Sequence, residues 1–239
     1  MRRSILSVLA VVVLLGRLSS QTQEPTLSFA LRGNYTSTSK VFNNPDSPSG
    51  DLRGQFNSVD NIYGIGAEVR WTVPGHSFAV SLAAEYLSKI SAQEQLVGFT
   101  TPPKRLPVDE GFRLVPVELG AQVFIPLGSD HVRLTMGGGL GAYIGSRVLK
   151  IAGVEAAERN APVYYGIHVE TSFDYRIRPG FFVRAEMRFR DPEFTSESEF
   201  TQPATQSGGV LVLLPRAPFR ARINVNGLNF GLGVGIEMF

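Results

Sequence analysis

The feature that most constrains the fold of this chain is an alternation of apolar and polar residues with a period of two. The last twelve residues, LNFGLGVGIEMF, show it plainly: every second residue from Leu228 to Met238 is apolar, and those between are Asn, Gly or Glu. Side chains of a β-strand point alternately to its two faces. This segment is therefore predicted to be a strand with one apolar face, which a protein core or lipid must cover.

The same alternation recurs along the chain and predicts an all-β protein of eight strands. The predicted strands cover residues 26–35, 61–71, 78–86, 115–125, 132–144, 163–175, 181–189 and 228–238. The connections alternate strictly between short turns, such as Arg178-Pro179-Gly180, and long polar loops at 36–60, 88–111, 146–162 and 191–219. An even number of strands with short turns at one end and long loops at the other is typical of an antiparallel up-and-down transmembrane β-barrel.

A ten-strand barrel is the alternative, because the C-terminal region is irregular. Ile223 and Val225 occupy odd positions while the apolar residues from Leu228 occupy even ones, so the parity slips at Asn226-Gly227. A β-bulge explains such a slip, although Asn-Gly is also a strong hairpin turn. The extra apolar run 210–214 is shorter than the roughly 9 to 11 residues that a tilted strand needs to cross a membrane. We therefore expect an external hairpin or strand extension there.

A soluble eight-stranded barrel of the lipocalin type would alternate too, with its apolar face inward. The composition of the polar face argues against it, because the four lysines of the chain (Lys40, Lys89, Lys104 and Lys150) all fall in predicted loops or at strand ends. The polar face instead carries seven arginines and seven carboxylates: Arg32, Arg70, Arg133, Arg176, Arg184, Arg188 and Arg190 with Glu68, Glu85, Glu118, Glu170, Asp174, Glu186 and Glu237. Balanced Arg–carboxylate pairs suit a closed interior, where an unpaired ion is costly. Interior glycines leave room for them, and aromatic residues at both strand ends would form two interfacial belts.

The N-terminus predicts export. Residues 1–20, MRRSILSVLAVVVLLGRLSS, have the order of charged, apolar and small residues of a secretory signal peptide, which leaves 21–239 as a single barrel domain. The chain has no cysteine, so it cannot form disulfides, and no later stretch is long and apolar enough for a membrane-spanning helix. A formal charge of +2 without a basic cluster gives no indication of nucleic-acid binding.

In this pattern, and in its terminal FGLGVGIEMF, the chain resembles the small eight-stranded outer-membrane β-barrels, of the type of the transmembrane domain of outer membrane protein A. The resemblance covers the whole mature chain. It implies a bacterial outer-membrane location with periplasmic termini and extracellular long loops. The implied partners are outer-membrane lipid and the barrel assembly machinery, which would recognise the last strand. The residues of that predicted assembly signal are Phe230, Leu232, Val234, Ile236, Met238 and Phe239.

A catalytic arrangement is suggested only by the segment HVETS, in which His168, Glu170 and Ser172 share the inward face of one strand. His168 and Ser172 would stand about 13 Å apart along the strand, too far for a hydrogen bond. We therefore assign His168 and Glu170 to an interior polar ladder and predict no catalytic residue, metal site or cofactor. The leading hypothesis is a non-enzymatic outer-membrane barrel with a structural or surface-interaction role and an unknown external partner. The alternative is a narrow channel or carrier for small or hydrophobic solutes; a lipid-modifying enzyme and a lipocalin-like binder are less well supported.

Overall fold

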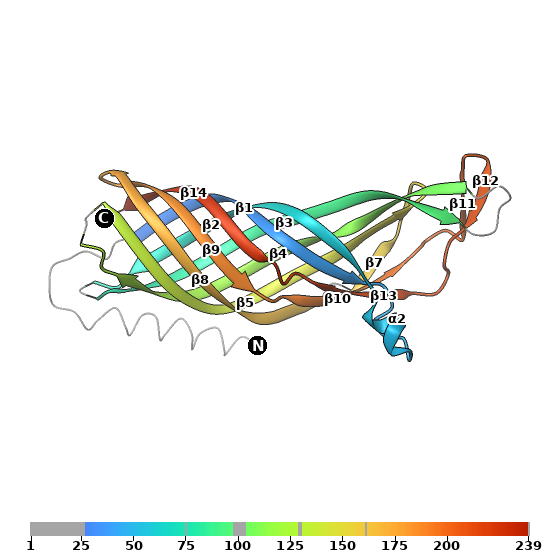
Figure 1. Ribbon diagram of the computed structural model, residues 1–239, viewed down its shortest axis with the longest axis horizontal. Coiled ribbons are helices and arrows are strands. Elements are labelled where there is room, and N and C mark those ends of the chain that lie inside the picture. The colour runs from blue at the N-terminus through green and yellow to red at the C-terminus, as the bar shows by residue number, and fades with distance from the viewer. Residues whose placement is uncertain (1–26, 75, 98–103, 129–130, 161, 239) are drawn as a thin grey trace.

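The protein is an eight-stranded antiparallel barrel (Figure 1). The computed structural model describes residues 27–74, 76–97, 104–128, 131–160 and 162–238, so the predicted signal peptide 1–20 lies outside the described residues. Strands pair in the order β14-β9-β8-β5-β4-β3-β2-β1, and β1 pairs again with β14, which closes the sheet. Their bounds are β1 (Leu27–Phe42), β2 (Phe56–Thr72), β3 (Phe78–Val97), β4 (Lys104–Ile125), β5 (Val132–Ile151), β8 (Val163–Arg178), β9 (Phe181–Arg190) and β14 (Leu228–Met238).

The predicted strand count is confirmed in favour of eight. The extra apolar run forms β12 (Val210–Leu213), which pairs with β11 (Ala204–Ser207) in a separate two-stranded sheet. This hairpin lies at the far end of the long axis (Figure 1). Among the described residues, no helix has the length and apolarity to cross a membrane.

The short turns gather at one end of the barrel. There Leu27 pairs with both Trp71 and Met238, so the first and last described residues are neighbours. The connection between β8 and β9 is closed by Gly180, whose φ of 79° lies in the left-handed region that glycine tolerates.

The opposite end departs from the prediction of long polar loops, because most of these residues form strands. β3 and β4 continue in register as far as Val97 and Lys104, and β1 and β2 as far as Phe42 and Phe56. The remaining distal elements are α2 (Gly50–Gly54), β6 (Val154–Glu155), β7 (Ala157–Asn160), β10 (Glu193–Glu199) and β13 (Phe219–Asn224).

The apolar row faces outward on the short-turn side, as predicted. Leu140, Ile167 and Leu232 are 68%, 71% and 71% exposed on the outer wall. The pair formed by Tyr35 and Tyr63, whose rings are 5.5 Å apart, ends this apolar surface on β1 and β2. We call the barrel between the short turns and this pair the turn-side half, and the strand extensions beyond it the distal half.

In the distal half the two faces exchange their chemistry. Buried apolar side chains fill its interior: Val41, Val59, Ile62, Leu87, Phe112, Leu114, Tyr143, Phe194, Ala221, Ile223 and Val225. We call this set the apolar core. The outer wall carries polar residues such as Ser58, Asp60 and Arg113, which are exposed. The distal half is therefore packed like a water-soluble barrel, with the apolar face inward.

This exchange also explains the parity slip near Asn226-Gly227. Thr36 pairs with Asn229 whereas Lys40 pairs with Asn224, so the β13–β14 side carries one additional residue and its register with β1 shifts by one. A Cβ on Gly227 would lie 2.6 Å from the Thr38 carbonyl oxygen, so the close approach requires glycine. Ile223 and Val225, however, are buried on the same inward side as Asn229. The inward row therefore keeps its parity through this segment, but it is apolar in the distal half and polar in the turn-side half. The apolar residues change parity at the boundary for this reason.

Candidate functional site: the interior charge network

The interior of the turn-side half is filled by charged side chains that strand alternation directs inward. β9 shows the rule most clearly, because every second residue from Phe182 to Arg190 is buried while Phe181, Val183, Ala185, Met187 and Phe189 are exposed. The strand thus delivers Arg184, Glu186, Arg188 and Arg190 to the interior.

Arg188 is the centre of this network. Its guanidinium pairs with Glu118, lies 2.6 Å from Glu170 and 3.4 Å from Glu186, and comes within 3.6 Å of Glu68 and of Glu85. These carboxylates come from five different strands. A single side chain therefore joins opposite walls of the barrel.

Two further groups of ion pairs flank Arg188. On one side Arg32 lies 2.8 Å from Glu85, which also pairs with Arg190. On the other side Arg184 lies 2.7 Å from Glu68 and 2.6 Å from Asp174.

Arg70 completes the second group, at 3.0 Å from Glu68 and 3.5 Å from Asp174. Forked guanidinium groups are suited to bridging several carboxylates in this way.

The buried part of the network is almost balanced in charge. Five buried arginines face six buried carboxylates: Arg32, Arg70, Arg184, Arg188 and Arg190, with Glu68, Glu85, Glu118, Glu170, Asp174 and Glu186. Burying so many ions is costly unless each is paired, and removing one partner leaves the others uncompensated. The network is therefore predicted to be stable only as a unit.

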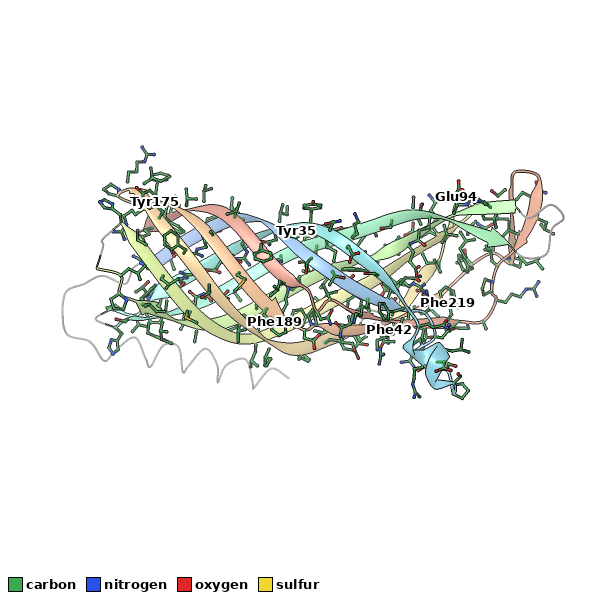
Figure 2. All side chains as sticks on the ribbon, viewed as in Figure 1. Tyr35, Phe42, Glu94, Tyr175, Phe189 and Phe219 are labelled. Atoms are coloured by element: carbon green, nitrogen blue, oxygen red, sulfur yellow. The ribbon has the colours of Figure 1, made fainter. Side chains whose placement is uncertain are left out.

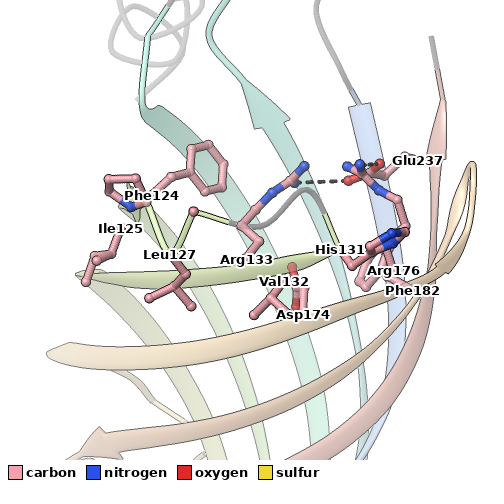
Figure 3. Close-up of a pocket in the computed structure, with 12 residues that line it drawn as sticks. Phe124, Ile125, Leu127, His131, Val132, Arg133, Asp174, Arg176, Phe182 and Glu237 are labelled. Carbon is pink, nitrogen blue, oxygen red and sulfur yellow. Dashed lines mark hydrogen bonds and ion pairs between the residues drawn. The ribbon is translucent and has the colours of Figure 1, made fainter.

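The remaining predicted charges, Arg133, Arg176 and Glu237, lie at the short-turn mouth. Glu237 holds both arginines, with Oε1 3.0 Å from Arg133 and Oε2 3.0 Å from Arg176 (Figure 3). They line a mouth cavity of about 430 Å³ together with Phe124 and Phe182. The predicted set thus extends from a buried network to a solvent-accessible mouth, and Asp174 of the network also lines the mouth cavity.

His168, Glu170 and Ser172 of the segment HVETS are all buried, but they contact different partners. Glu170 accepts from Arg188 and Gln122, whereas the Ser172 hydroxyl bonds to Thr135 and lies 3.4 Å from Arg70. His168 pairs across the strands with Gly139 and Arg190, and its Nδ1 has no hydrogen-bond partner among the described residues. The contacts do not link the three into a catalytic relay.

Several interior residues were missed by the sequence reasoning. Gln122 joins the network by donating to Glu170, and Tyr143 joins it through a 3.1 Å hydrogen bond from its hydroxyl to Glu118. Both share the parity of the inward row of their strand, so the alternation could have found them. Arg147 and Glu110 form a buried pair in the distal half, where we expected loops.

The glycines of the inward rows make room for the charged side chains, as expected. A Cβ on Gly231 would lie 2.7 Å from Cγ of Glu186. Within the described residues, no cluster of three or more His, Cys, Asp or Glu could hold a metal ion.

The residues of the predicted assembly signal form an outward row on β14. Phe230, Leu232, Val234 and Met238 are exposed on the outer wall, and Ile236 is half-buried. Phe239 lies outside the described residues.

Comparison with solved structures identifies the fold. The chain is similar to the outer membrane protein OprG of Pseudomonas aeruginosa, with a TM-score of 0.56, 11% sequence identity and coverage of 90% of this chain and 95% of that one. It is also similar to Neisserial surface protein A, with a TM-score of 0.50, 10% identity and coverage of 90% and 100%. No protein-family model matches the sequence, and no curated protein matches it significantly. At this identity the likeness establishes the fold of a small outer-membrane β-barrel.

Proposed function

We propose, from the premise that this chain has the fold of a small eight-stranded outer-membrane β-barrel, that it is a non-enzymatic integral outer-membrane protein with a closed lumen. Its turn-side half would be the anchor in the lipid and its distal half the surface that meets external partners. The observation that carries the proposal is the continuous filling of the bore, first by the charge network and then by the apolar core.

The outer wall supports the membrane placement. Aromatic residues lie at both limits of the apolar surface: the exposed Tyr175 lies near the short turns, and the half-buried Tyr35 and the exposed Phe189 lie near the middle of the long axis (Figure 2). From Leu27 to Tyr35 the chain rises about 26 Å along β1, or roughly 20 Å across the membrane once the strand is tilted. This height is comparable with the roughly 25 Å apolar band of outer-membrane barrels.

The orientation follows from the two ends. Short turns of such barrels face the periplasm and long connections face outside, so the short-turn mouth would be periplasmic and the distal half extracellular. Outer-membrane lipid would cover the turn-side half. The assembly machinery would read the outward row of β14, and the external partner would contact the distal half.

A labelling experiment tests this orientation, and the absence of native cysteine makes it clean. Ser58→Cys places a thiol on the exposed distal wall and His76→Cys places one at an exposed short turn. A membrane-impermeant maleimide should label intact cells carrying Ser58→Cys, and should label His76→Cys only after the outer membrane is opened. The reverse pattern would overturn the orientation.

Planar-bilayer recording tests the closed lumen. The refolded chain, shown to be inserted by a shift in gel mobility between unheated and boiled samples, should give no discrete current steps, because eight-stranded barrels have bores just wide enough for their own side chains. Regular steps would favour the alternative function of a narrow channel.

A separate test addresses the enzyme hypothesis. If the protein is not an enzyme, His168→Ala and Ser172→Ala should leave the lipid A and phospholipid profiles of an expressing strain unchanged.

A further inference from the structure

We draw no further inference here: the strongest candidate, the apolar groove across β1, β2 and β3 whose lining includes Gly33, Ala67 and Ala84 on the outer wall of the turn-side half, belongs to the lipid-facing surface already described, and nothing in the described residues shows that a partner other than membrane lipid covers it.

Discussion

The two halves of this barrel share the long strands β1 to β5 but have opposite faces apolar. In the turn-side half, Leu140 and Ile167 face outward and Arg188 faces inward; in the distal half, Asp60 faces outward and Ile223 inward. The backbone pairing runs through the boundary, as the register of β3 with β4 shows. The comparison teaches that the surroundings of each half, rather than the sheet, decide which row of side chains is apolar.

The largest effect is expected from the interior of the turn-side half. Arg188→Ala removes the group that joins Glu118, Glu170 and Glu186, and should lower the free energy of unfolding by about 3–5 kcal/mol because those carboxylates are left buried without compensation. Urea unfolding in lipid vesicles measures this loss. Arg105→Ala, at an exposed ion pair with Glu94, is the control. A loss below 1 kcal/mol for Arg188→Ala would show that the network is not a unit.

Next in size is the effect of a charge on the two outer walls. Leu140→Arg puts a cation on the apolar wall and should cost about 2–4 kcal/mol if lipid covers it. The same substitution at Ser58, which is exposed in the distal half, should cost almost nothing, since water covers that wall. Equal costs at both positions, measured by the same unfolding assay, would remove the distinction between the halves.

A smaller effect compares two isoleucines. Ile223 is fully buried in the apolar core, whereas Ile65 is 71% exposed on the outer wall of the turn-side half. Ile223→Val should lower the free energy of unfolding by about 0.5–1.5 kcal/mol, because a methylene group is lost from a packed interior. Ile65→Val should have little effect, because in the proposed membrane placement lipid fills the space. A larger loss of unfolding free energy for Ile65→Val than for Ile223→Val would indicate that the packed core lies on the other face of the sheet.

The smallest effect is expected at the distal surface. Arg220 and Asp46 lie 3.2 Å apart with both side chains largely exposed, so solvent screens the pair. Arg220→Ala should change the free energy of unfolding by less than about 1 kcal/mol. A larger loss would indicate that this surface takes part in folding of the distal half.

The sequence predicted the turn-side half well because its rows keep one parity from end to end. The alternation of β9 and β14 alone separates the inward from the outward residues of these two strands. The ion-pair partners inside the barrel could not be derived. Arg188 contacts carboxylates from strands far apart in sequence, and the position of a residue on its strand does not determine which side chains meet across the interior.

The distal half was missed for a physical reason. Its inward row is apolar and its outward row is polar. The assignment that holds in the turn-side half, with apolar residues outward and polar residues inward, is therefore reversed there. Leu106 and Val108 are buried on β4, yet the Ser, Gln and Lys residues around this region read as a solvated loop. The ion pair of Arg147 and Glu110 was overlooked with it, since both residues fell in segments assigned to loops.

The β11–β12 hairpin has a practical consequence for protein engineering. It forms its own sheet, so none of the eight pairings that close the barrel passes through it. Its tip consists of Gly208 and Gly209, with φ values of 56° and 75°. Exposed loop tips of this kind tolerate inserted sequence. A peptide epitope grafted between the two glycines would be carried at the far end of the molecule without altering the register below, which makes the hairpin an attachment point for display of foreign sequences.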